Sequence, residues 1–238
     1  MSLLVLGLNH QTAPVALRER ISVSENHQEQ TLRALLTVPG VRHAVLLSTC
    51  NRTEIYSQLD DGQEPQLARW LAEHHGLAPE ALDEFIYRHR DEEAVKHLFR
   101  VAAGLDSMIL GEPQIFGQVK QAWSIARQTD SVHGVLDRLF QQTFATAKRI
   151  RTETRIGAHP VSVAYASVKL AKQLFSQLEQ STVMLIGAGE TIELAAQHLA
   201  NANVKRMIIA NRTLEHAQNL ASRFSAFALP LNAAVKHF

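Results

Sequence analysis

The sequence contains one cysteine in 238 residues, so it cannot form an intramolecular disulfide. It also lacks an excess of charge, because 24 Lys and Arg residues stand against 23 Asp and Glu residues. A near-neutral chain cannot hold nucleic acid through its overall field, so such a partner would need a local basic patch. No apolar run approaches the roughly 18 residues that span a bilayer, and no basic signal region opens the chain. We therefore expect a soluble protein of the reducing cytoplasm.

Residues 1–158 first alternate strand and helix patterns and then become helical. Apolar and β-prone runs predict four strands, and amphipathic stretches predict two helices, the first capped by Ser24. The expected strands are residues 3–8, 44–49, 53–59 and 85–87, and the expected helices are residues 24–36 and 66–75. This order is that of a ferredoxin-like split βαβ unit. We predict an α/β protein whose ferredoxin-like domain, extended by helices from residue 91 to about 155, precedes a partial Rossmann-type βαβ domain over residues 159–238.

The second region centres on a glycine turn between an apolar strand at residues 183–186 and an amphipathic helix. A second strand is expected at residues 207–210. In this frame a glycine turn lets the pyrophosphate of a dinucleotide approach the backbone at a helix N-terminus. The third glycine of the usual fingerprint is replaced by Ile192. The candidate cofactor residues of this turn are Gly187, Ala188, Gly189, Glu190, Thr191 and Ile192.

The end of the second strand indicates which dinucleotide is bound. An acidic residue there would bind a ribose 2′-hydroxyl, but the sequence has Asn211, Arg212 and Thr213. A guanidinium and a hydroxyl suit an additional 2′-phosphate, so the sequence predicts NADPH over NADH. The alternative is a glycine turn that binds no nucleotide.

Cys50 follows an apolar strand and has polar neighbours on both sides, including Thr49, Asn51 and Arg52. A lone cysteine is commonly a small buried hydrophobe, but these neighbours suit an apolar pocket poorly. In an extended chain Cys50 and Arg52 would point to the same side, and the guanidinium would favour the thiolate. Beside a nicotinamide cofactor, a reactive thiolate suggests a thioester that accepts a hydride.

The helical pattern after residue 91 predicts one helix that Gly111 terminates and a second that begins at Pro113. An apolar stripe on the first helix is expected to lie beside a polar one that could line a substrate site. The apolar stripe is Leu98, Ala102, Leu105 and Ile109, and the polar stripe is His97, Arg100, Gly104, Ser107 and Gly111. Each of these residues also has an alternative without a role in a site. His97 could simply lie at the edge of a buried face, and Gln114 and Gln118 could lie on a solvated face. The remaining histidines show no ligand-like spacing, so we expect no structural metal site.

Several segments resemble glutamyl-tRNA reductases, and STCNRTE and GEPQIxGQVK are specific motifs of that family. The resembling segments are GLNHQTAPV (7–15), RER (18–20), LLSTCNRTEIY (46–56), GLDSMILGEPQIFGQVKQA (104–122), AKRIRTET (147–154), IGAGETIELAAQHL (186–199) and IIANRT (208–213). The resemblance implies NADPH-dependent reduction of glutamyl-tRNA to glutamate-1-semialdehyde, the first committed step of tetrapyrrole and haem biosynthesis. It implies that Cys50 carries the glutamyl thioester and that His97 acts as an acid or base.

The resemblance also implies a glutamate pocket in which Arg52 pairs with the side-chain carboxylate of the substrate. The residues that match this pocket are Thr49, Asn51, Arg52, Ser107, Glu112, Pro113, Gln114 and Gln118. A basic face could track the phosphates of tRNA, although a charged helix face is more commonly only solvated. That face comprises Lys148, Arg149, Arg151, Arg155, Lys169 and Lys172. Transfer of the aldehyde to a glutamate-1-semialdehyde aminomutase is an expectation at the level of the family.

Members of the family are longer than this sequence and dimerise through a C-terminal helical domain. We therefore expect the chain to keep the acyl-transfer chemistry, to bind NADPH poorly or not at all, and not to form the dimer of the family. Two alternatives remain open. One is a cysteine-dependent glutamyl-tRNA esterase in which water accepts the acyl group, and the other is a non-catalytic tRNA-binding module.

Overall fold

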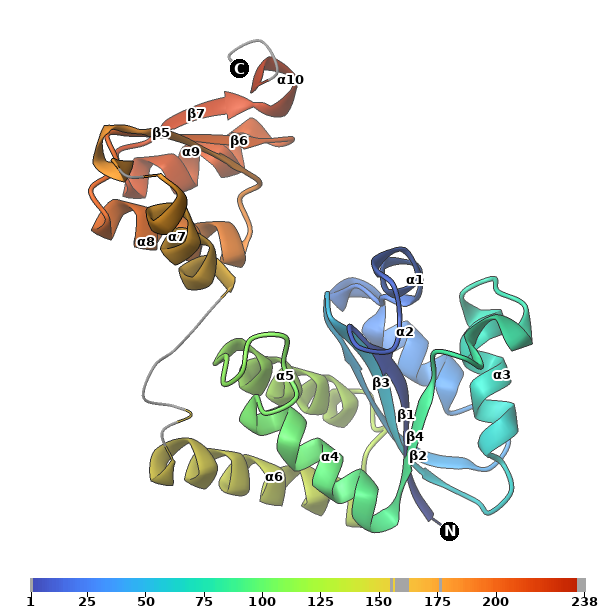
Figure 1. The fold of residues 1–238 in the computed structure, drawn as a ribbon. Helices are drawn as coiled ribbons and strands as arrows, with labels where there is room; N and C mark the ends of the chain where they lie inside the picture. Colours follow the sequence, from blue (N-terminus) through green and yellow to red (C-terminus); the bar gives the residue numbers. More distant parts are fainter. Residues whose placement is uncertain (1, 155, 157–162, 176, 235–238) are drawn as a thin grey trace. The chain divides into compact units, whose positions relative to one another are not determined.

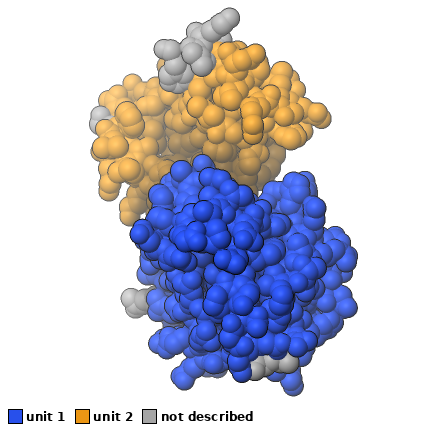
Figure 2. Space-filling view, turned by 90° about the vertical axis from the view of Figure 1, so that its right-hand side faces the viewer, with its two compact units in different colours: residues 1–160 blue, residues 161–238 orange. Residues whose placement is uncertain are grey.

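The computed structural model describes residues 2–154, 156, 163–175 and 177–234. The chain divides into two compact units, Met1–Pro160 and Val161–Phe238, which Figure 2 shows in different colours. Each unit has its own hydrophobic core. Among the described residues, no helix combines the length and the apolar character needed to cross a bilayer.

Unit 1 is built on a four-stranded antiparallel sheet with the order β2-β3-β1-β4. The strands are β1 (Ser2–Asn9), β2 (Val41–Ser48), β3 (Arg52–Leu59) and β4 (Tyr87–Arg90). Helix α2 (Glu25–Leu35) connects β1 to β2, and α3 (Glu64–His74) lies between β3 and β4. Strands β1 and β2 flank the antiparallel β3, so the expected ferredoxin-like split βαβ unit is confirmed.

Helices cover both faces of this sheet (Figure 1). Helices α2 and α3 lie on one side, and three further helices lie on the other, where α4 contacts β1 and α5 contacts β2. These three are α4 (Asp91–Ala103), α5 (Gln114–Gln128) and α6 (Gly134–Glu153). Strand β3 is therefore buried along nearly its whole length instead of alternating between core and solvent. Its polar side chains must find partners inside the protein.

Unit 1 differs from the sequence-based expectation at the start of β4 and at the end of α4, and it contains one additional helix, α1 (Val15–Ile21). The last strand begins at Tyr87, because the N–H groups of Phe85 and Ile86 bond the carbonyl of Leu82 in the turn after the 3-10 helix η1 (Pro79–Leu82). Helix α4 ends at Ala103, so the predicted stripes do not continue to Gly111. Gly104 ends the helix in the left-handed region with φ 79°. Helix α1 had not been predicted.

Unit 2 is a three-stranded parallel sheet with the order β5-β6-β7. The strands are β5 (Thr182–Ile186), β6 (Arg206–Asn211) and β7 (Phe227–Pro230). The helical elements are α7 (Val163–Leu174), η3 (Leu178–Gln180), α8 (Glu190–Asn201), α9 (Leu214–Arg223) and α10 (Leu231–Ala234). Helix α8 connects β5 to β6 and α9 connects β6 to β7, so the predicted Rossmann-type βαβ domain is confirmed.

Candidate active site

Cys50 lies with Asn51 in the tight turn that connects β2 to β3. The N–H of Thr49 donates to the carbonyl of Arg52 at 2.8 Å and closes the turn. The side chain of Thr49 accepts hydrogen bonds from the N–H groups of Asn51 and Arg52, both at 3.1 Å. Cys50 is exposed. Because the chain turns here, the expectation that Cys50 and Arg52 point to the same side of an extended segment is wrong.

The arginine that reaches the Cys50 turn is Arg18 from α1, which belongs to the resembling segment RER (18–20) but for which the sequence predicts no role. Its Nη1 donates to the carbonyl oxygen of Cys50 at 2.8 Å and to Oδ1 of Asn51 at 3.2 Å. Its Nε donates to the carbonyl of Ala13 at 3.2 Å. Only 9% of the Arg18 surface is exposed.

Arg52 instead turns inward and is 2% exposed. Its Nη1 lies 2.8 Å from Oε1 of Glu54, and both terminal nitrogens contact Oδ2 of Asp106 at 3.2 Å. Burial by itself lowers the pKa of Arg52, but the acidic groups around it, with Glu54 the strongest of them, together outweigh burial and raise the pKa. Two carboxylates thus already neutralise the guanidinium. Recognition of a substrate carboxylate by Arg52 stays a prediction and would require it to share these contacts.

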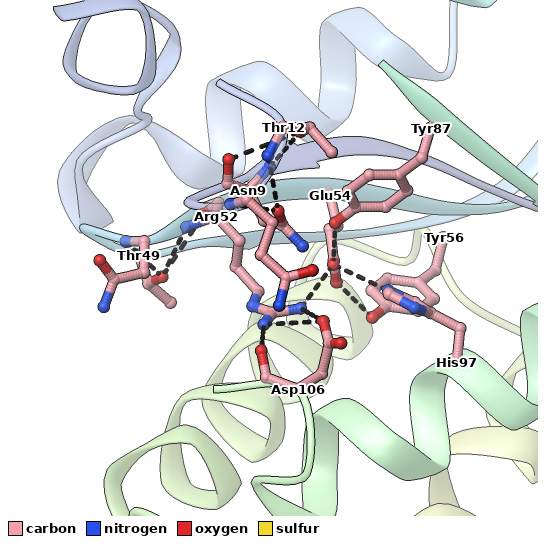
Figure 3. Close-up of polar contacts among 11 residues, drawn as sticks. Asn9, Thr12, Thr49, Arg52, Glu54, Tyr56, Tyr87, His97 and Asp106 are labelled. Carbon is pink, nitrogen blue, oxygen red and sulfur yellow. Dashed lines mark hydrogen bonds and ion pairs between the residues drawn. The ribbon is translucent and has the colours of Figure 1, made fainter. Parts of the chain in front are cut away.

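Glu54 is fully buried and is the centre of a polar network that Figure 3 shows. It accepts hydrogen bonds from the hydroxyls of Tyr56 and Tyr87, and its Oε1 lies 2.9 Å from Nε2 of His97. Burial raises the pKa of Glu54, but the charge of Arg52 and the hydrogen bond from His97 outweigh it and lower the pKa. The side chain is therefore a carboxylate, which can only accept, so Nε2 of His97 donates.

The two tyrosines remain hydrogen-bond donors. Burial, and then the charge of Glu54, raise the pKa values of Tyr56 and Tyr87 well above the ordinary value of tyrosine. With both phenols protonated and Nε2 of His97 donating, the second ring nitrogen, Nδ1, is the atom of a neutral His97 that can accept a proton. The network therefore fixes one tautomer of His97.

A pocket of about 400 Å³ lies on the His97 side of the network. Its walls come from the end of β1, from β4, from α4 and from the loop after α4. They are formed by Asn9, Gln11, Thr12, Tyr87, His89, Glu93, Lys96, His97, Arg100 and Asp106. The ring of His89 stacks on His97 with 4.5 Å between centroids, and burial followed by His97 lowers the pKa of His89. The pocket therefore presents mostly polar groups beside the imidazole.

The loop between α4 and α5 carries much of the predicted glutamate pocket. Gly104 and Gly111 approach closely and are joined by a backbone hydrogen bond of 2.8 Å, and Arg151 donates to the carbonyls of Ala103, Gly111 and Glu112. Ser107 Oγ is buried without a hydrogen-bond partner among the described residues. Pro113 caps α5, and Glu112, Gln114 and Gln118 are half-buried. Within the described chain, no hydrogen bond joins these pocket residues to Cys50 or His97.

The glycine turn of unit 2 follows β5 and leads into α8. Gly187 has φ 115°, which favours glycine, and its N–H bonds the carbonyl of Ala210 in β6 at 2.7 Å. Gly189 caps α8, whose first residues are Glu190 and Thr191, and a Cβ at Gly189 would meet no atom within 4 Å. This open approach to a helix N-terminus fits a pyrophosphate. Ile192 packs against Gly187, where a Cβ would lie 3.3 Å from its side chain.

The end of β6 lies beside this turn, because β5 and β6 are parallel and pair in register. Asn211 donates from Nδ2 to the carbonyl of Thr213 at 2.9 Å, and Thr213 caps α9. Arg212 is exposed between them. An exposed guanidinium at this edge fits the 2′-phosphate that the sequence predicts.

The basic face expected to track tRNA phosphates is only partly available. Arg149 pairs with Glu153 at 3.2 Å, and Arg151 is used to hold the loop after α4. Arg155 lies outside the described residues. Lys148 is exposed on α6, and Lys169 and Lys172 belong to unit 2.

A ferredoxin-like unit with a cysteine turn, followed by a Rossmann-type unit with an open glycine turn, places this chain among two-unit α/β proteins whose second unit has a nucleotide-binding type of fold. The family model described as "Glutamyl-tRNAGlu reductase, N-terminal domain" matches residues 6–154, and that described as "Shikimate / quinate 5-dehydrogenase" matches residues 169–238. The chain belongs to the glutamyl-tRNA reductase family.

Individual relatives agree with this assignment. The chain is 58% identical over 237 residues to a glutamyl-tRNA reductase of Xanthomonas campestris pv. campestris (strain B100) and 56% identical to one of Xanthomonas oryzae pv. oryzae (strain MAFF 311018). Each alignment covers 100% of this chain and 54% of the relative. The solved glutamyl-tRNA reductase of Methanopyrus kandleri matches with a TM-score of 0.60 and 34% identity over 99% of this chain and 55% of that chain. The chain thus spans about half the length of the relatives it matches.

Proposed function

We propose that this chain carries the acyl-accepting site and a nucleotide site of a glutamyl-tRNA reductase. The reaction is the NADPH-dependent reduction of glutamyl-tRNA to glutamate-1-semialdehyde, the first committed step of tetrapyrrole biosynthesis. The observation that carries the proposal is the single cysteine, which is exposed in a hydrogen-bonded turn directly before β3, the strand of Arg52 and Glu54. The chain that carries it is 58% identical to a glutamyl-tRNA reductase. The same similarity supports the reductase over the esterase and the binding-module alternatives.

In the proposed reaction the Cys50 thiolate attacks the ester carbonyl carbon of glutamyl-tRNA. The carbon–oxygen bond to the ribose of the terminal nucleotide breaks, and the ribose oxygen takes up a proton as tRNA leaves. The product is a thioester between the glutamyl group and Cys50. His97 serves as the proton carrier, taking the thiol proton on Nδ1 and returning it to the ribose oxygen, because its Nε2 is held by Glu54.

NADPH is the cofactor we propose for unit 2. The backbone of residues 187–192 would hold the pyrophosphate, and Arg212 with Asn211 and Thr213 would hold the 2′-phosphate. When bound, NADPH supplies the hydride that converts the thioester into the aldehyde and releases the Cys50 thiolate. The residues of this chain contribute binding and orientation.

We assign residues 1–158 to glutamyl transfer and residues 159–238 to the nucleotide. The glutamate pocket is proposed to use Thr49, Asn51, Arg52, Ser107, Glu112, Pro113, Gln114 and Gln118. Glutamyl-tRNA is the partner, and a cytoplasmic glutamate-1-semialdehyde aminomutase is the enzyme that would consume the reactive aldehyde.

Mass spectrometry after mixing the chain with glutamyl-tRNA in the absence of NADPH tests the first half of the reaction. We expect a glutamyl mass increase that maps to Cys50 and is absent in Cys50→Ala. Intact glutamyl-tRNA and no adduct would overturn the proposal.

A further inference from the structure

We propose that Arg18 is a positioning residue that holds the Cys50 turn in the conformation from which the thiol reacts. The proposal rests on the function proposed above. Arg18 is buried although it carries a full positive charge, and all its acceptors among the described residues are oxygens of neutral groups. A buried guanidinium that satisfies carbonyls is costly to maintain, so its placement at the nucleophile indicates a specific task.

The Cys50 turn needs an external support because it contains no glycine and has few bonds of its own. The side chain of Thr49 holds the two N–H groups on the inner side of the turn. The carbonyl of Cys50 and the amide oxygen of Asn51 are bound from outside the turn by Nη1 of Arg18. Fixing the carbonyl of a residue fixes its peptide plane, and this limits the directions in which the Cys50 Sγ can point.

Arg18 also ties this turn to a second one. Its Nε donates to the carbonyl of Ala13, in the turn after β1 where the N–H of Ala13 bonds the carbonyl of Asn9 at 2.9 Å. Asn9 is the residue paired with Arg52 across the sheet. One planar guanidinium therefore connects the turn after β1 with the turn before β3 that carries the nucleophile. A lysine ammonium is a point donor on a flexible stem and cannot reproduce this fork.

The expected consequence lies in the rate of acylation and not in the affinity for glutamyl-tRNA. Misplacing a nucleophile lowers the rate of the chemical step, whereas binding contacts elsewhere remain. For Arg18→Met we expect the single-turnover rate constant of thioester formation to fall roughly 10- to 100-fold. The half-saturating concentration of glutamyl-tRNA should change by less than about threefold. Arg18→Lys should recover only part of the rate.

The matched control is Arg20→Met, since Arg20 belongs to the same short helix and also donates to a backbone carbonyl, that of Gly76 at 2.8 Å, away from the Cys50 turn. Amide hydrogen exchange provides a readout that does not depend on the reaction. We expect faster exchange at residues 49–52 in Arg18→Met, unchanged exchange in the core strands, and wild-type behaviour in Arg20→Met.

The outcomes separate this proposal from the function on which it rests. Thioester formation at the wild-type rate in Arg18→Met would overturn the positioning role, and so would an equal loss of rate in Arg20→Met. Faster exchange throughout unit 1 would also overturn it, because Arg18 would then support the fold in general. A wild-type chain that forms no thioester would overturn the proposed function, and exchange at residues 49–52 would still decide whether Arg18 holds the turn.

Discussion

The Nε2 atom of His97 in α4 lies 2.9 Å from Oε1 of Glu54 in β3, although the two residues are 43 positions apart in the sequence. Because Glu54 is held as a carboxylate by Arg52, this contact orients the imidazole and leaves Nδ1 as the atom that can exchange a proton. The role proposed for His97 therefore depends on two residues that do not themselves react.

Replacing Glu54 with Gln should destabilise unit 1 by at most about 3–5 kcal/mol, the usual cost of removing one partner of a buried ion pair, because Asp106 still contacts Arg52. The amide nitrogen would also face the donors of Arg52, Tyr56 and His97. Urea denaturation measures the change. Glu29→Gln is the control, because Glu29 forms an exposed pair with Arg33 at 2.8 Å, and it should leave the midpoint unchanged. Equal midpoints for wild type and Glu54→Gln would contradict the network described here.

The stability contributed by Glu54 should depend on pH. The pKa of Glu54 is lower in the folded chain than the value of about 4.3 typical of an unfolded chain. The contribution is therefore fully present above the unfolded value and is lost as the pH falls through the folded value. Between about pH 5 and pH 3 the wild type should lose more unfolding free energy than Glu54→Gln does. Parallel pH profiles for the two proteins would exclude this contribution.

His97→Gln should lower the rate of thioester formation by about 10²- to 10⁴-fold, the range typical of a lost acid–base group. Single-turnover reactions with glutamyl-tRNA measure the rate, and the dependence of the wild-type rate on pH should flatten in the variant. His74→Gln is the control, because His74 is an exposed residue of α3 that stacks on Trp70. An unaffected rate in His97→Gln would remove His97 from the mechanism and leave Glu54 with a structural role only.

Most of the fold could be predicted because its signals are local. Apolar runs locate β1 and β2, an alternating pattern locates β3, and the glycine turn between a strand and a helix locates unit 2. The misplaced start of β4 has a physical reason, since Phe85 and Ile86 are apolar but are bound into the turn after Leu82. The end of α4 was wrong because both Gly104 and Gly111 can stop a helix. The contact between these two glycines, which a local pattern does not reveal, selects the first.

The site was predicted only in part. Cys50 and His97 are recognisable from residue type and neighbours, but Arg18, Tyr87 and Asp106 reach the site through tertiary contacts that no local spacing reveals. Glu54 had a signal that was overlooked. Arg52, Glu54 and Tyr56 occupy alternate positions of β3 and therefore share one face, and three polar residues on one face of a buried strand predict an internal network.

Arg212→Ala should weaken NADPH binding at least about tenfold and leave NADH binding nearly unchanged, because a guanidinium contributes a charge-assisted bond to the 2′-phosphate alone. Fluorescence titration of both nucleotides measures the two dissociation constants. Arg206→Ala is the control, since Arg206 lies at the start of β6, at the opposite end from Arg212, and its guanidinium stands over Phe227. An equal loss for NADPH and NADH would show that Arg212 does not discriminate between them.

Arg151→Met should loosen the loop between α4 and α5, because three backbone carbonyls lose their shared donor. We expect a loss of stability of about 1–3 kcal/mol and faster amide exchange across residues 104–113, which include Asp106. Arg149→Met is the matched control, two residues away on α6, where the side chain pairs with exposed Glu153. If the two variants show the same exchange across this loop, Arg151 does not hold it. Faster exchange in Arg151→Met alone would show that a residue expected to contact tRNA phosphates instead supports the loop that brings Asp106 to Arg52.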